Sequence, residues 1–72
     1  MITVEYKING TTYIRDFYDN PMTTKSLLEY VSIDAELPMS WLVNNFDTNS
    51  YLETLNELER YNILTVKSIE VF

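Results

Sequence analysis

The fold is decided by the stretch ITVEYKINGTTYIRDF, residues 2–17, which has the pattern of two strands joined by a tight turn. Apolar and polar residues alternate on both sides of Asn9 and Gly10, and a period of two is typical of a half-buried strand. Asn-Gly is the strongest short hairpin signal, because a type I′ turn needs positive φ at both central residues. We therefore predict a β-hairpin with strands over residues 2–8 and 11 to 17 or 18.

The two-residue turn also predicts which residues face each other across the hairpin. Arg15 is the misfit on the face that should be buried, since most of its companions there are apolar. Its side chain either extends to water at the edge of the sheet or is turned outward by a bulge, and a functional role is a third interpretation. The predicted pairs are Ile8 with Thr11, Tyr6 with Tyr13, Val4 with Arg15, and Ile2 with Phe17.

Two helices are expected after the turn at Asp19-Asn20-Pro21. Thr23 or Thr24 offers the N-cap of a helix that runs to Val31 or Ile33. Pro38 then suits the first turn of a short second helix. The side chains of this second helix that could cover the core are Met39, Trp41, Leu42, Val43 and Phe46.

A clearer helix is predicted over residues 47–62. Ser50 and Glu53 form a capping box, and Asp47 adds negative charge at the positive end of the helix dipole. The side expected to face the core carries Leu52, Leu55, Leu58 and Tyr61, with Tyr51 near them.

The closing strand is predicted over residues 63–72, with imperfect alternation. Leu64 and Val66 have one parity, and Ile69 and Val71 have the other. Either a bulge near Lys67-Ser68 brings both pairs to one face, or both sides of the strand are partly buried. The chain is thus expected to be one α+β domain over residues 1–72, a three-stranded sheet with two or three helices on one face. The pattern leaves open whether the last strand pairs with the first or the second.

Composition argues against catalysis. The 72 residues hold eleven acids and five bases, no His, no Cys and one Gly. The usual acid/base at neutral pH, thiol nucleophiles, nitrogen or sulfur zinc sites and Gly-rich phosphate loops are therefore absent. We expect a non-enzymatic protein without cofactor or metal. The chain shows no secretory signal and no apolar run of about 20 residues, so we expect a cytoplasmic location without membrane insertion.

Acidic residues supply the candidate partner site. The stretch from Ser26 to Glu59 contains no Lys or Arg, and the net charge of −6 repels nucleic acid and attracts basic surfaces. If the acids share one face, they form a docking surface for a basic partner protein; otherwise they are a solvated face that keeps the domain soluble. The candidate partner-binding residues are Glu57, Glu59 and Glu53, with Asp47, Glu36 and Asp34 as flanks.

In size, acidity and lack of catalytic residues, with the acids from Asp34 to Glu59, the chain resembles the small acidic proteins that phages make to inhibit host factors. Some of these are DNA mimics that dimerise and occupy the DNA-binding arms of a histone-like nucleoid protein. The resemblance implies a homodimer in the host cytoplasm that inhibits a basic, DNA-binding host protein without binding nucleic acid itself.

Two alternatives belong to other classes. The protein could be an adaptor or inhibitor that docks a protease or polymerase subunit through an apolar and aromatic patch around Trp41 and Phe46. It could also be an assembly subunit that works by pairing of sheet edges.

Overall fold

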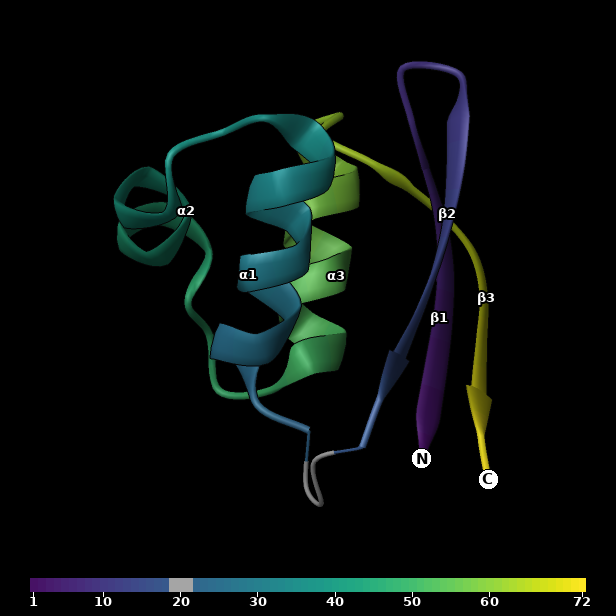
Figure 1. The fold of residues 1–72 in the computed structure, drawn as a ribbon. Helices are drawn as coiled ribbons and strands as arrows, with labels where there is room; N and C mark the ends of the chain where they lie inside the picture. The colour runs from purple at the N-terminus through teal and green to yellow at the C-terminus, as the bar shows by residue number, and fades with distance from the viewer. Residues whose placement is uncertain (19–21) are drawn as a thin grey trace.

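The computed structural model describes residues 1–18 and 22–72, so the predicted turn at Asp19, Asn20 and Pro21 lies outside the described residues. Figure 1 shows the helices gathered on one side of the sheet, which confirms the predicted α+β fold. Within the described residues the strands have the order β2-β1-β3 and run antiparallel to their neighbours. The elements are β1 (Ile2–Ile8), β2 (Thr11–Phe17), α1 (Thr24–Ala35), α2 (Met39–Phe46), α3 (Tyr51–Arg60) and β3 (Thr65–Val71).

The hairpin forms as the sequence predicts. Asn9 and Gly10 both have positive φ, 49° and 86°, as a type I′ turn requires. All four predicted pairs occur, including Val4 opposite Arg15. The register of the hairpin predicted from the alternation of apolar and polar residues is therefore confirmed.

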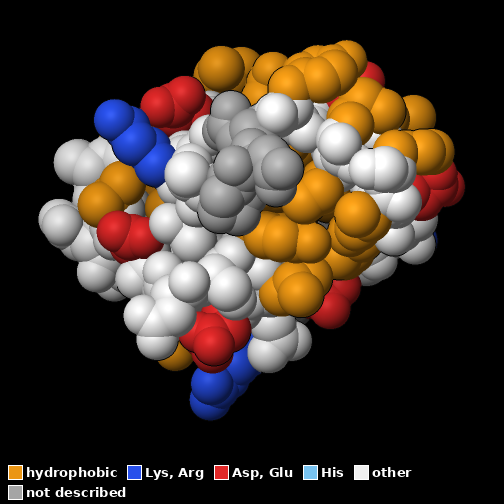
Figure 2. Space-filling model, turned by 90° about the horizontal axis from the view of Figure 1, so that it is seen from below, with side chains coloured by type: hydrophobic (Ala, Val, Ile, Leu, Met, Phe, Trp, Pro, Cys, Tyr) orange, Lys and Arg blue, Asp and Glu red, His pale blue; other side chains and the backbone are white. Residues whose placement is uncertain are grey.

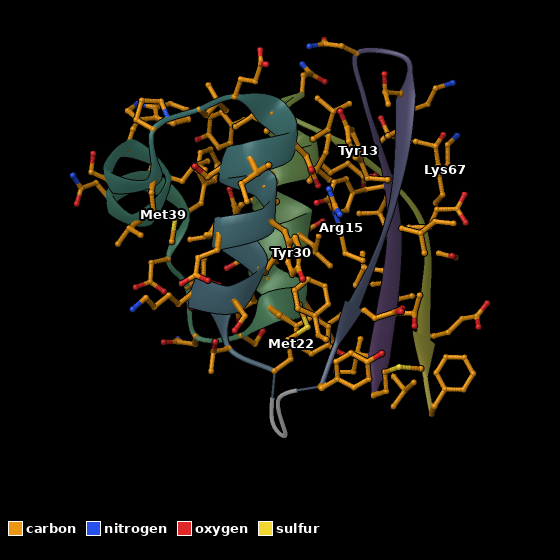
Figure 3. All side chains as sticks on the ribbon, viewed as in Figure 1. Tyr13, Arg15, Met22, Tyr30, Met39 and Lys67 are labelled. Carbon is orange, nitrogen blue, oxygen red and sulfur yellow. The ribbon has the colours of Figure 1, made fainter. Side chains whose placement is uncertain are left out.

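The third strand pairs with β1, which the sequence left open. Glu5 is opposite Ser68 and Tyr6 is opposite Val66, so Lys67 is the extra residue of a bulge. The predicted bulge is thereby confirmed. It returns the apolar residues on both sides of it to the face that the helices cover, and Figure 3 shows Lys67 on the other side of the sheet.

Capping residues fix where the helices begin. The Thr23 hydroxyl accepts a hydrogen bond from the Ser26 N–H at 3.1 Å, and α1 continues to Ala35, beyond the predicted end. The Ser50 hydroxyl accepts from the Glu53 N–H at 3.2 Å, so α3 begins at Tyr51. The predicted cap at Ser50 is thereby confirmed, but the predicted helical range of residues 47–62 was too long at both ends.

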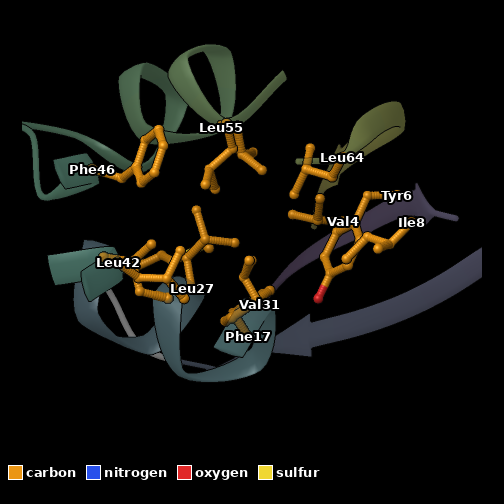
Figure 4. Packing of buried hydrophobic residues seen from close by; sticks show 13 residues of the cluster. Val4, Tyr6, Ile8, Phe17, Leu27, Val31, Leu42, Phe46, Leu55 and Leu64 are labelled. Carbon is orange, nitrogen blue, oxygen red and sulfur yellow. The ribbon is translucent and has the colours of Figure 1, made fainter. Parts of the chain in front are cut away.

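The core lies between the sheet and the helices (Figure 4). Leu42 and Phe46 are buried, but Trp41 and Val43 of α2 are exposed, contrary to the prediction. A helix of eight residues buries a single narrow stripe, and Leu42 and Phe46, four residues apart, occupy it. On α3, Leu55 and Leu58 are buried, whereas Leu52 and Tyr61 at the two ends are exposed. The buried apolar residues are Val4, Tyr6, Ile8, Phe17, Met22, Leu27, Leu28, Val31, Leu42, Phe46, Leu55, Leu58 and Leu64.

We predict that Gly10→Ala destabilises the protein by about 1 kcal/mol, because an L-residue with a Cβ resists the left-handed conformation. Apart from Gly10 and its two neighbours in the chain, no described atom lies within 4 Å of where a Cβ would stand, so the cost comes from the backbone conformation. Urea unfolding measures it, and Thr12→Ala on the neighbouring strand is the control. An unchanged unfolding midpoint for Gly10→Ala would contradict the role given to the turn.

Candidate functional site

One of the six candidate acids is internal. The side chain of Asp34 is 1% exposed and forms an ion pair with the Arg15 guanidinium, whose side chain is 30% exposed. Arg15 Nε donates to Asp34 Oδ2 at 2.9 Å, a second guanidinium nitrogen donates to Oδ1, and the Tyr6 hydroxyl also donates to Oδ2. Figure 3 shows Arg15 reaching from β2 toward α1, and its guanidinium lies 5.0 Å from the centre of the Tyr30 ring.

These contacts account for the misfit base of the hairpin. Arg15 neither leaves the sheet through a bulge nor extends freely to water, because a carboxylate on α1 receives it. The hydrogen bond to Asp34 raises the pKa of the Arg15 guanidinium further above its ordinary range. Asp34 is consequently not available to a partner, and the idea that it flanks an acidic surface was wrong.

Three other candidate acids have contacts within the molecule. A Glu59 carboxylate oxygen accepts the Val66 N–H at the outer edge of β3, at 2.9 Å. Asp47 accepts a hydrogen bond from the Thr24 hydroxyl at 2.7 Å. Glu57 lies 3.5 Å from Arg60 in an exposed ion pair, which stabilises the helix only slightly.

The remaining two acids are exposed but far apart in the fold. Glu36 follows the C-terminus of α1, and Glu53 lies in the first turn of α3. In Figure 1 the two helices run in the same direction, so these residues lie at opposite ends of the helical layer. The described acids therefore do not form one continuous array on a single face.

A groove between α2 and α3 is the better-formed site. It has a volume of about 580 Å³. Buried Phe46 forms its centre, with exposed Trp41 and Tyr61 on either side. Both outer rings meet Phe46 edge to face, with centroid distances of 5.6 Å to Trp41 and 5.7 Å to Tyr61. The lining residues are Trp41, Asn45, Phe46, Thr48, Glu57, Tyr61 and Ile63.

Hydrogen bonds hold the two walls of this groove in place. The hydroxyl of fully buried Thr54 donates to the Phe46 carbonyl at 2.9 Å and thus ties α3 to the end of α2. The Thr48 hydroxyl lies 2.8 Å from that of Thr54. On the other wall, the Asn45 amide donates to the Trp41 carbonyl at 2.8 Å. The aromatic groove is thus built before any partner arrives.

One acid lines the groove, and it forms an ion pair with a base beside the groove. Glu57 lies on its rim, and the Arg60 guanidinium lies 5.8 Å from the centre of the Tyr61 ring. Because the exposed Glu57–Arg60 pair is weak, a cation from outside can replace Arg60 at little cost. The arrangement can receive a large apolar side chain with a positive charge next to it.

The sequence carried signals for both features. Leu27, Val31 and Asp34 are spaced as one helical stripe, but the predicted helix ended at Val31 or Ile33, so the stripe was not extended to Asp34. For the groove, Trp41 and Phe46 were named as an alternative patch and Glu57 as a partner-binding acid. Tyr61 was expected in the core and Ile63 in a strand, and no pattern placed them beside α2.

Comparisons of the chain with protein-family models, with curated proteins and with solved structures found no match. No described helix is long and apolar enough to cross a membrane. Over residues 1–18 and 22–72, no three acidic side chains gather in a way that could hold a metal ion.

We predict that Arg15→Met costs about 3 kcal/mol of stability, because Asp34 is left buried and charged without its partner. Arg15→Met combined with Asp34→Leu should recover most of this loss, since an apolar pair of similar volume removes the unpaired charge. Urea unfolding of both variants measures the difference. Additive losses in the double variant would show that the pair is not coupled.

The Tyr6 hydroxyl predicts a specific alkaline response. Burial, followed by the hydrogen bond and charge of Asp34, raises the pKa of Tyr6 above its usual value of 10.0. Below pH 10.0 the Tyr6 hydroxyl is protonated in both the folded and the unfolded protein. Above that pH the hydroxyl of the unfolded protein loses its proton first, while the folded protein keeps it. Stability therefore falls by about 1.4 kcal/mol per pH unit until the folded state also titrates.

Tyr6→Phe removes this contribution, so its stability should fall less steeply above pH 10.0 than that of the wild type. Unfolding measured in urea between neutral and alkaline pH tests it. Tyr18→Phe is the matched control, because the Tyr18 side chain is exposed and should leave the wild-type slope unchanged. Equal slopes for wild type and Tyr6→Phe would refute the assignment.

Proposed function

We propose that this protein is a non-enzymatic, acidic binding domain that docks a basic segment of another protein in the groove between α2 and α3. The observation that carries the proposal is the pair of exposed rings, Trp41 at 44% and Tyr61 at 61%, held against buried Phe46. Aromatic residues dominate binding hot spots, because they bury a large area while losing little conformational freedom.

Charge supports the choice of partner. The chain has a net charge of −6, and Glu57 stands beside the aromatic rings. A basic segment would be attracted at long range and then fixed by one Lys or Arg at Glu57. Its anchor would be a large apolar side chain between Trp41 and Tyr61. The groove volume of about 580 Å³ is within the range of pockets that bury such groups.

DNA mimicry of a host nucleoid protein's substrate stays a prediction from the resemblance. It needs a regular set of free carboxylates, and Asp34 is lost to that set because it is buried in an ion pair, while Glu59 and Asp47 are exposed but each already accepts one hydrogen bond within the chain. The groove needs only residues that are already in place. It therefore supports a protein-docking function better, whether the docked protein is inhibited or recruited.

Selection of displayed random peptides against the folded protein tests the proposal. We predict enrichment of peptides with a large apolar residue next to Lys or Arg. Trp41→Ala should weaken their binding by 2 kcal/mol or more, about 30-fold, as expected for a hot-spot residue. Trp41 is the only Trp of the chain, so its fluorescence reports binding to the wild type, and calorimetric titration measures binding to the Trp41→Ala variant, which has no Trp.

The matched control is Val43→Ala, because Val43 is an exposed apolar residue of α2 that does not line the groove. Its binding should equal that of the wild type. Peptides that bind Trp41→Ala as tightly as the wild type would sink the proposal. Loss of binding in Glu53→Lys with unchanged binding in Trp41→Ala would instead support docking through the acids.

A further inference from the structure

The outer edge of β3 is open along part of its length. Met1 and Phe72 exchange backbone hydrogen bonds, with Phe72 N 2.8 Å from the Met1 carbonyl. Since alternate residues face the neighbour in an antiparallel ladder, the N–H groups of Ile69 and Val71 point away from β1. The Val66 N–H points the same way, but the Glu59 carboxylate accepts it. Within residues 1–18 and 22–72, the edge is thus capped near Val66 and unpaired around Ile69 and Val71.

Apolar side chains surround this free edge. Val71 and Phe72 are each 72% exposed, and Ile69 is also exposed. Exposed Met1 is paired with Phe72, and exposed Leu52 lies in the first turn of α3, which Figure 1 places at the same end of the molecule. Figure 2, which shows that end, has hydrophobic side chains gathered over a broad part of the surface. A small soluble domain gains stability if such a surface is covered.

We propose that β3 pairs antiparallel with β3 of a second copy of this chain, centred on Ile69, and joins the two sheets into one. An edge strand is its own partner about a two-fold axis, and the Ile69 residues of both copies would exchange their free N–H and C=O groups. The pairing would also cover Val71 and Phe72.

Charge favours pairing with a second copy of the chain in the register that sets Ile69 opposite Ile69. With Ile69 opposite itself, Ser68 faces Glu70 of the second copy, and Lys67 lies beside that Glu70. If the two-fold axis passed through Glu70 instead of Ile69, Glu70 would lie opposite Glu70 of the second copy, and two like charges directly opposite each other are destabilising. Two antiparallel copies of β3 are therefore complementary to each other in charge and in apolar surface.

The other edge of the sheet, which is formed by β2, is less suited to pairing with a second copy. On the helix-facing side of β2, Thr11 is polar and Arg15 is engaged with Asp34. On the outer side, exposed Ile14 is flanked by Asp16, which accepts a hydrogen bond from Thr3 at 2.8 Å. Pairing through β2 would cover Ile14 and, just beyond the strand, Tyr18, whereas pairing through β3 would cover Ile69, Val71 and, just beyond the strand, Phe72.

Sedimentation equilibrium of the full chain, from about 1 to about 200 µM, tests the dimer. The wild type should reach twice the monomer mass. Ile69→Lys should weaken the dimer at least tenfold while its circular dichroism stays that of the folded protein. Ile14→Lys, the matched change on the other edge strand, should dimerise as the wild type does. A wild type that is monomeric throughout, or a dimer lost in Ile14→Lys and kept in Ile69→Lys, would overturn the proposal.

A single cysteine tests the register, because the chain has none of its own. Residues in a hydrogen-bonded pair have Cα atoms about 5.5 Å apart, which a disulfide can span. Ile69→Cys should therefore form a covalent dimer under mild oxidation, whereas Ile14→Cys should not. Absence of the Ile69→Cys cross-link would refute the register. Trp41→Ala should leave the dimer intact, so this proposal and that of the groove fail separately.

Discussion

The buried carboxylate of Asp34 is the constraint on which the helical layer depends. A charged group with so little exposure is costly unless it is paired and hydrogen-bonded, and among the described side chains Asp34 has this compensation from Arg15 on β2 and Tyr6 on β1. The contact of Asp34 with Arg15 and Tyr6 therefore fixes both the rotation of α1 about its own axis and its position along the hairpin. Because α2 and α3 pack against α1 and one another, their positions follow from that contact. Apolar packing alone, being non-directional, would hold the helix to the sheet without fixing its register.

Much of the acidity of the chain has an internal use. Asp34 binds the hairpin, Glu59 accepts an edge N–H of β3, and Asp47 meets a hydroxyl at the start of α1. A run of acids in the sequence is therefore not equivalent to a field on the surface. The net charge of −6 acts at long range, while close contact in the proposed function would depend on the shape of the α2–α3 groove.

The groove and the free edge of β3 share a physical origin. A chain of about 70 residues buries roughly 60% of its unfolded surface, so large apolar side chains remain outside a core of this size. Five of them lie in two groups: Trp41 and Tyr61 flank one groove, and Ile69, Val71 and Phe72 border one sheet edge. The rings of the groove lie on α2 and just after α3, and the apolar edge residues lie on and just after β3, so the two proposed interactions involve different aromatic and apolar side chains.

The sequence by itself determined everything that depends on neighbours along the chain. Asn9-Gly10 set the hairpin and its register, Ser50 set the start of α3, and the parity break at Lys67 set the bulge. These are local effects of backbone conformation and side-chain period. The tertiary structure decided the rest: the pairing of β3 with β1, the contact of Arg15 with Asp34, and the place of Tyr61 beside Phe46. Each joins segments far apart in the chain or separated by a turn, where spacing carries no information about distance. Only the packing of whole elements, with every buried charge requiring a partner, could fix them.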